Sequence, residues 1–270
     1  MSGAALPYTS DEMMTVAAAR RLRDGAVCFV GIGLPSAACN LARLTHAPNL
    51  VLIYESGTVG TRPRVLPLSI GDGELAETAT TVIALPEIFT HYLQGGRVDV
   101  GFLGAAQIDW FGNLNSTVVG PYGTPAVRLP GAGGAPEIAA HARDVFVVMK
   151  QTARSFVADL AFRTSVGFGD GPGSREALGY RGRGPRAVIT DRGVLTPDAA
   201  TCELTLTELY EGTTADQARA ATGWPLRVAD APVVAAPPTA HELEILRDLH
   251  RRTKEAHAQH VRIPLPSPLP

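Results

Sequence analysis

One carboxylate stands out among the residues whose type and position could support chemistry. Glu55 directly follows the apolar run 50–54 and is itself followed by Ser56 and Gly57. A carboxylate in this place would lie at the carboxyl end of a buried strand, which is where open α/β sheets bind their ligands. The same position also fits a side chain that leaves the sheet for water or caps the next turn. Position alone does not separate these two interpretations.

Two glycine-rich turns could bring backbone amides to a ligand. The turn from Gly31 to Gly33 precedes a helix that Ser36 can cap, and such a helix start suits an anion. Because Ser36 stands where a dinucleotide fingerprint has its third glycine, the sequence does not support NAD binding. The loop 131–134 exposes consecutive amides that could stabilise an oxyanion. A tight turn and a mobile hairpin are the structural alternatives.

Other polar clusters favour structural explanations. Asp72, Glu74 and Glu77 could do acid–base work or hold a metal, but acidic residues gather at helix starts because of the helix dipole. The histidines lack the paired spacing of a metal site, so we expect no metal. No Gly-x-Ser-x-Gly motif is present, and nothing specifies a Ser-His-Asp triad.

Short apolar runs alternate with helical patterns, which predicts an α/β fold. We expect a layered open sheet of about six mainly parallel strands, flanked by helices. The runs of strand length are residues 26–30, 50–54, 81–85, 98–103, 145–149 and 187–190. The helices are predicted over residues 11–22 (capped by Ser10), 37–44, 86–93, 213–222 and 240–258. The Gly-, Asn- and Pro-rich stretch 109–134 predicts loops and hairpins, which often carry function.

Length and charge narrow the class of protein. The 270 residues fit one large domain, predicted over residues 9–258, with an extension before it and a proline-rich, unpacked tail over residues 259–270. A net charge of -2 offers no general attraction to nucleic acid or to anionic lipid. Three cysteines without C-x-x-C spacing, and no apolar run of membrane-spanning length, predict a cytoplasmic protein.

Five motifs taken together are more specific than any one of them. They are Tyr54-Glu-Ser-Gly57 and the segments 66–77, 101–109, 111–115 and 129–135. Together they resemble the β subunits of family I coenzyme A transferases, in the branch similar to glutaconate CoA-transferase. The resemblance runs from about residue 9 to about residue 257 and implies that family's fold.

The resemblance implies a role for Glu55. In that family the glutamate of a Glu-Ser-Gly or Ser-Glu-Asn-Gly turn is the covalent nucleophile, and Glu55 matches it. Steroid-ring-cleaving relatives lack this turn, which argues against their hydrolytic role. The family's glycine loop matches residues 131–134. The remaining site residues are Gly31, Gly33, Gly133 and Gly134 for the oxyanion or CoA, and Ser56, Arg62 and Arg64 for the acid substrate.

The implied chemistry is consistent with first principles. A carboxylate attacks an acyl-CoA thioester, the released thiolate attacks the glutamyl carbonyl, and the enzyme-bound CoA passes to a second acid by the reverse steps. Amide donors must stabilise each oxyanion, and water must be excluded because both intermediates hydrolyse. CoA is then a substrate, and no permanently bound cofactor is expected.

The resemblance also implies partners and a substrate. Two-subunit members need an α subunit for much of the CoA site, so we expect a hetero-oligomer of α2β2 type or larger. Transfer of CoA from succinyl-CoA to 3-oxoadipate in aromatic catabolism is the implied activity, and Arg62 and Arg64 could clamp the far carboxylate. Glutaconate or another diacid, a thioesterase and a non-catalytic ligand sensor remain alternatives.

Overall fold

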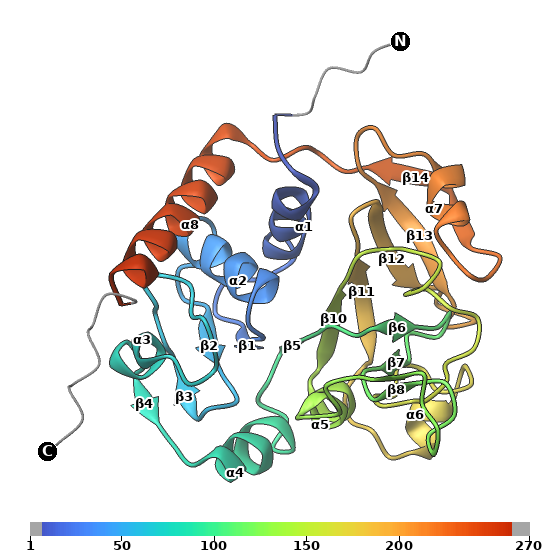
Figure 1. The fold of residues 1–270 in the computed structure, drawn as a ribbon, viewed down its shortest axis with the longest axis horizontal. Coiled ribbons are helices and arrows are strands. Elements are labelled where there is room, and N and C mark those ends of the chain that lie inside the picture. Colours follow the sequence, from blue (N-terminus) through green and yellow to red (C-terminus); the bar gives the residue numbers. More distant parts are fainter. Residues whose placement is uncertain (1–6, 261–270) are drawn as a thin grey trace, which may run out of the picture.

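The computed structural model describes residues 7–260, and its central feature is one ten-stranded sheet (Figure 1). The strand order is β14-β13-β12-β11-β10-β5-β1-β2-β3-β4. Five central neighbours run parallel, as crossover connections through helices allow. These strands are β2 (Val51–Ile53), β1 (Val27–Phe29), β5 (Val100–Leu103), β10 (Asp144–Val148) and β11 (Pro185–Ile189). The predicted open sheet of mainly parallel strands is therefore confirmed.

The sheet is wider than the six predicted runs because further strands extend it at both ends. The added strands are β3 (Thr58–Val59), β12 (Gly193–Pro197), β13 (Leu204–Leu209) and β14 (Arg227–Val234). The predicted run 81–85 pairs only over β4 (Thr81–Val82), whose two residues are both exposed at the end of the sheet. Strands this short or this exposed lack the continuous apolar run that marks a buried strand.

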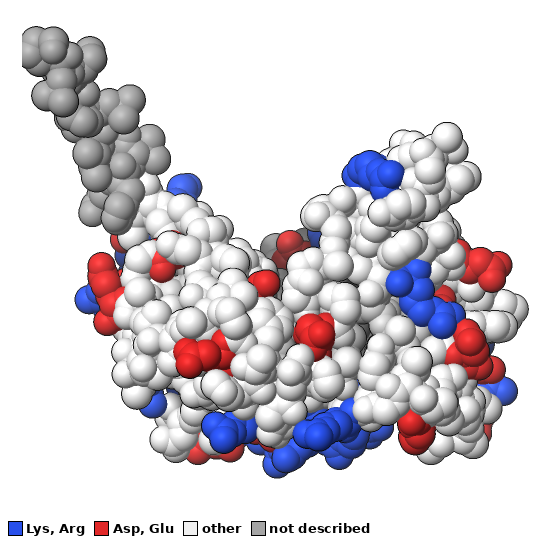
Figure 2. Space-filling view, turned by 90° about the horizontal axis from the view of Figure 1, so that it is seen from below, with Lys and Arg blue, Asp and Glu red and all other residues white. Residues whose placement is uncertain are grey.

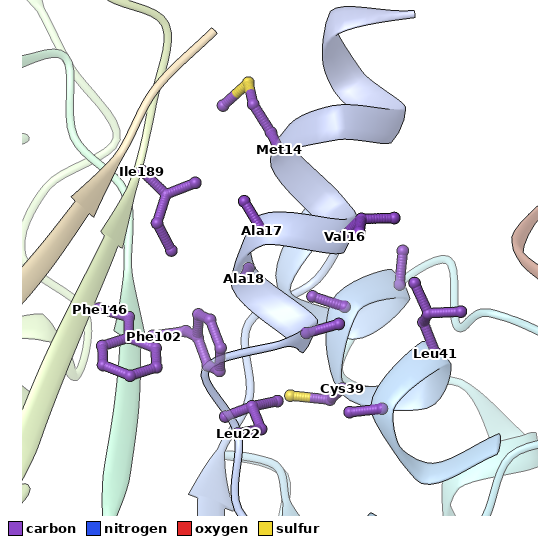
Figure 3. Packing of buried hydrophobic residues seen from close by; sticks show 14 of the residues in the cluster. Met14, Val16, Ala17, Ala18, Leu22, Cys39, Leu41, Phe102, Phe146 and Ile189 are labelled. Atoms are coloured by element: carbon purple, nitrogen blue, oxygen red, sulfur yellow. The ribbon is translucent and has the colours of Figure 1, made fainter. Parts of the chain in front are cut away.

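Alternate residues of the strands enter two cores, one on each face of the sheet. Helices α1 (Ser10–Ala19), α2 (Leu34–Leu44) and α8 (Ala240–His260) cover one face. Figure 3 shows side chains of α1 and α2 packed with Phe102, Phe146 and Ile189 of the sheet. The other face is covered by α4 (Leu85–Glu87), the π-helix η1 (Ile88–Leu93) and α5 (Ala135–His141).

Two predicted helix caps are wrong. Thr9 rather than Ser10 caps α1, because the Thr9 hydroxyl accepts the Glu12 amide at 3.1 Å while the Glu12 carboxylate accepts the Thr9 amide at 2.8 Å. Helix α2 begins three residues early, after Gly33 at φ +83°. Ser36 therefore lies inside the helix, and its hydroxyl is available for a different contact.

Two predictions about the smaller elements are confirmed. Asp72 caps α3 (Gly73–Glu77), which confirms the helix-start explanation of the acidic cluster. The stretch 109–134 contains loops and parts of two hairpins, as predicted. The remaining elements are β6 (Gln107–Ile108), β7 (Leu114–Asn115), β8 (Val118–Val119), β9 (Val127–Arg128), α6 (Ser174–Ala177) and α7 (Ala215–Ala220). In the described part of the chain, no helix combines the length and apolar character that crossing a membrane requires. The predicted tail begins two residues too early, because α8 continues through residues 259 and 260, and residues 261–270 lie outside the described residues.

Helix α8 is tied to the end of α1 by one carboxylate. Both oxygens of Glu242 accept from Arg20, at 2.7 and 2.8 Å, and one also accepts the Thr239 amide at 2.8 Å. Burial raises the pKa of Glu242, but these hydrogen bonds outweigh it and lower the pKa to about 2. The bound carboxylate therefore stabilises the fold above the unfolded-state pKa of about 4.3, and this contribution is lost as pH falls toward 2.

We expect Glu242→Gln to lower Tm at pH 7 by about 2–4 °C, the shift that roughly 1 kcal/mol produces in a chain of this size. The difference from the wild type should narrow between pH 4.5 and pH 2. Thermal melts across this range are the measurement. Glu244→Gln, an exposed position on the same helix, is the matched control and should leave Tm unchanged at every pH. If Glu242→Gln lowered Tm by the same amount at every pH, the ionisation of Glu242 could not be the source of the stabilisation.

Candidate active site

Glu55 lies in a tight turn that glycine alone can close. Strand β2 ends at Ile53, and the Gly57 amide donates to the Tyr54 carbonyl at 3.0 Å, so Glu55 occupies the turn between them. Gly57 has φ +103°, and a Cβ there would lie 2.1 Å from the Ile83 carbonyl oxygen. Backbone of the segment after β4 therefore packs directly against the turn, which leaves the half-buried Glu55 side chain at the carboxyl end of β2.

Tyr54 connects this turn to helix α2 through a buried hydrogen bond. Its ring is fully buried, and its hydroxyl lies 2.8 Å from the Ser36 hydroxyl, which also donates to the Gly31 carbonyl at 3.1 Å. Burial raises the pKa of Tyr54, so the phenol is neutral at physiological pH. Ser36 thus links the turn that carries Glu55 to the glycine turn after β1.

The glycine loop meets Glu55 at Gly134. A Cβ at Gly134 would lie 3.3 Å from Glu55 Oε1 and 2.8 Å from Cζ of Phe89. Residues 55, 89 and 134 therefore converge from three separate segments at one point. Neither the Gly133 nor the Gly134 amide donates to an acceptor within residues 7–260, and Gly133 is exposed while Gly134 is buried.

A buried polar network holds the glycine loop in place. The Gly131 amide donates to the Ser116 carbonyl and the Ser116 hydroxyl donates to the Gly131 carbonyl, both at 2.8 Å. The preceding Asn115 is fully buried, and its amide nitrogen donates to Gln107 Oε1 at 2.8 Å and to the Val118 carbonyl at 2.7 Å. The motif 111–115 therefore has a structural explanation: it fixes the hairpin that carries the loop.

Ser56 shares the turn with Glu55. Its hydroxyl is buried and has no hydrogen-bond partner among the described residues. The Thr58 hydroxyl, two residues further on, is also buried without a hydrogen-bond partner among the described residues. An unpaired buried hydroxyl lowers the stability of the fold, so its presence calls for an explanation. Two such hydroxyls beside a candidate nucleophile are donors that a bound molecule could use.

The other predicted residues line cavities of their own, bind other side chains or are exposed. Gly31 and Gly33 border cavities on the α1–α2 side of the sheet, and Gly31 shares one of about 390 Å³ with Lys150. Arg64 is exposed and binds Glu74 at 3.3 Å, because the start of α3 folds back against it. Arg62 is also exposed, and forms no ion pair within the described chain.

Sequence reasoning missed the third member of the cluster. Phe89 belongs to η1, where the expected helix 86–93 widens to π geometry, and its ring packs against Phe29 with centroids 6.0 Å apart. Single turns of π-helix occur often at functional sites. The sequence gives no signal for this, because Pro86 marks only the start of a helix.

Comparison with known proteins agrees with this geometry. The sequence model of the coenzyme A transferase family matches residues 11–221. The B subunit of 3-oxoadipate CoA-transferase from Pseudomonas knackmussii is 60% identical over 93% of this chain and 97% of that protein. The B subunit of glutaconate CoA-transferase from Acidaminococcus fermentans is 35% identical, over 86% of this chain and 89% of that protein.

A solved structure agrees as well. The crystal structure of glutaconate CoA-transferase from Acidaminococcus fermentans matches with a TM-score of 0.85 at 33% identity, covering 90% of this chain and 94% of that one. The resemblance that the five motifs indicated is thereby confirmed in sequence and in fold. The chain belongs to the coenzyme A transferases of family I, on the B-subunit side of that family.

Proposed function

We propose that this chain is the B subunit of an enzyme that transfers CoA from succinyl-CoA to 3-oxoadipate in the breakdown of aromatic compounds. The observation that carries the proposal is the position of the Glu55 carboxylate against Gly134, at the carboxyl end of a parallel strand. The identity of 60% to the corresponding chain of a 3-oxoadipate CoA-transferase supports the choice of acid.

Glu55 acts as the nucleophile in four balanced steps. Its carboxylate attacks the succinyl thioester and expels CoA thiolate, leaving a succinyl-glutamyl anhydride. The thiolate attacks the glutamyl carbonyl and releases succinate, which leaves CoA on Glu55 as a thioester. A carboxylate of 3-oxoadipate then attacks this thioester to give a second anhydride and free thiolate. Attack of the thiolate on the oxoadipyl carbonyl forms 3-oxoadipyl-CoA and restores Glu55.

The residues around Glu55 supply what these steps need. Each addition places negative charge on a carbonyl oxygen, and the unpaired amides of Gly133 and Gly134 are candidates to bind it. The unpaired Ser56 hydroxyl is a further donor, for the same oxygen or for a substrate carboxylate. Phe89 borders Glu55 with an apolar ring, which helps to keep water from the anhydride.

The A subunit of the enzyme is expected to complete the CoA site, with an assembly of A2B2 type or larger. The names of the relatives describe B subunits, which fits this division. CoA enters and leaves as a substrate. The gene next to this one is the natural place to look for the A subunit.

Acid specificity tests the proposal directly. With its A subunit, the chain should use 3-oxoadipate with a kcat/KM at least about 10-fold higher than glutaconate, acetate or acetoacetate. A donor for the far carboxylate favours a diacid over the two monocarboxylates. The higher identity to the 3-oxoadipate enzyme, 60% against 35%, favours 3-oxoadipate over glutaconate. Arg64 already binds Glu74, whereas the exposed Arg62 forms no ion pair within the described chain, so Arg62 is the candidate of the two that needs no rearrangement. The measurement is initial rate across this panel of acids with succinyl-CoA.

The same assay separates the alternatives. A preference for glutaconate would assign the chain to the glutaconate enzymes instead. Consumption of succinyl-CoA without any acceptor acid would indicate a thioesterase. Arg62→Gln should raise KM for 3-oxoadipate while leaving KM for acetate unchanged, whereas Arg186→Gln, at another exposed arginine, should change neither.

A further inference from the structure

Helix α2 carries a stripe of polar side chains on a buried face. Ser36, Asn40 and Arg43 are spaced i, i+4 and i+7, so they lie along one side of the helix. Ser36 and Asn40 are fully buried, and Arg43 is half-buried. We infer that this polar stripe holds the segment 54–63 at both ends and thereby positions the Glu55 carboxylate for reaction, an inference that rests on the proposed function.

The first end of the segment is held at Tyr54. The Ser36 hydroxyl has one proton, which it donates to the Gly31 carbonyl at 3.1 Å. The Tyr54 hydroxyl lies 2.8 Å from Ser36 Oγ and is therefore the donor in their hydrogen bond. Burial raises the pKa of Tyr54, so this proton stays in place at physiological pH. Because Tyr54 directly precedes Glu55, its bonded ring fixes the point at which the turn begins.

The second end of the segment is held at Pro63. Asn40 Nδ2 donates to the Ser36 carbonyl at 2.9 Å, and Asn40 Oδ1 accepts from Arg43 Nη2 at 3.0 Å. The same Arg43 nitrogen donates to the Pro63 carbonyl at 2.9 Å. Pro63 directly follows Arg62, the candidate for the far carboxylate of the acid. One side of α2 is thus bonded to the chain both before and after the reacting turn.

Polar side chains in this place call for an explanation, because apolar ones would fill the core that α2 shares with α1 and α8 without needing partners. A buried network whose members are hydrogen-bonded to one another fixes a single arrangement, which apolar packing does less strictly. The face of the molecule that carries α3 and α4 shows acidic and basic side chains together (Figure 2). A field of one sign therefore does not set the place of a charged group there, and short-range contacts have to do so.

Two buried tyrosines allow a matched test of this positioning. We expect Tyr54→Phe to lower kcat of the enzyme assembled with its A subunit about 10-fold, because a turn that shifts by a fraction of an ångström misplaces the nucleophile. The KM for succinyl-CoA should stay within about 2-fold, since the Tyr54 ring is fully buried. Tyr210→Phe is the control and should leave kcat unchanged. The Tyr210 hydroxyl is buried in the same core but has no hydrogen-bond partner among the described residues.

Hydrogen exchange reports on the turn without relying on catalysis. The Gly57 amide donates to the Tyr54 carbonyl and closes the turn around Glu55. In the assembled enzyme, we expect this amide to exchange at least about 5-fold faster in Tyr54→Phe than in the wild type or in Tyr210→Phe. Mass spectrometry of the peptide that contains Tyr54 to Gly57 measures the exchange, and thermal melts check that each variant is folded.

A second variant tests whether the two hydroxyls act as one unit. Ser36→Ala should lower kcat at least as much as Tyr54→Phe, and the double variant should lose no more than Ser36→Ala alone. If Tyr54→Phe does not fold, Ser36→Ala carries the same expectation for kcat and for exchange. An unchanged kcat, an equal loss in Tyr210→Phe, additive losses in the double variant, or a lower kcat without faster exchange would each overturn the inference. A wild-type pair that forms no CoA adduct on Glu55 would refute the proposed function, whereas the exchange rates would still show whether the polar stripe holds the turn.

Discussion

Glu55→Gln is expected to lower CoA transfer by the assembled enzyme about 10⁴-fold or more. Glutamine keeps the size of the side chain but cannot form the anhydride, so every later step is lost. Removal of a covalent nucleophile has effects of this order, well above the loss of a surface carboxylate. The measurement is kcat with succinyl-CoA and 3-oxoadipate.

A covalent adduct gives this prediction a second, independent readout. Double-displacement kinetics require that succinate leaves before 3-oxoadipate reacts. Incubation of the wild-type enzyme with succinyl-CoA alone should therefore leave CoA on the peptide that contains Tyr54 to Gly57. Mass spectrometry of the borohydride-reduced peptide detects the reduced residue. The adduct should be absent in Glu55→Gln.

Two other carboxylates serve as controls. Glu74 binds Arg64, Glu77 lies in the same short helix, and neither forms a hydrogen bond or ion pair with Glu55 in the described chain. Glu74→Gln and Glu77→Gln should still form the adduct at Glu55. Near-normal transfer by Glu55→Gln, in fresh enzyme whose mass excludes deamidation, would remove Glu55 from the mechanism.

Gly134→Ala is expected to lower kcat about 100-fold. The added Cβ would lie 2.8 Å and 2.9 Å from two atoms of the Phe89 ring and 3.3 Å from Glu55 Oε1. Something must therefore move, and a displacement of about 1 Å at a nucleophile costs a factor of this size. The KM for succinyl-CoA should change less than kcat, because the crowding acts on the reacting carboxylate.

Another glycine provides the control for this substitution. Gly73 begins α3, and a Cβ there would have only an ordinary contact, 3.9 Å from Glu77 Oε1. Gly73→Ala should keep kcat within about 2-fold and gain slightly in helix propensity. Thermal unfolding of both variants separates misplacement from loss of fold. A kcat for Gly134→Ala close to the wild type would show that the glycine loop is not part of the reacting site.

Most of the parallel sheet could be predicted from the sequence, and the added strands could not. The buried strands β1, β2, β5, β10 and β11 each contain an apolar run, and such runs carry their own signal. Strands β12 to β14 are only partly buried, and β3 and β4 have two residues each. These strands form because a neighbouring strand offers hydrogen bonds, which no local pattern reports.

Sequence by itself determined the place of Glu55 at the end of a buried strand, the glycine needed in its turn, and the family to which the motifs belong. Only the tertiary structure decided which groups meet there. Gly134 and Phe89 reach Glu55 because the chain crosses over between parallel strands, whereas the Gly31 turn is linked to the same turn through Ser36 and Tyr54. The pairing of Arg64 with Glu74 was also decided by tertiary structure, because α3 folds back on Arg64. Residue patterns report on neighbours within one helix or strand, but contacts between distant segments depend on strand order and on the face to which each connection packs.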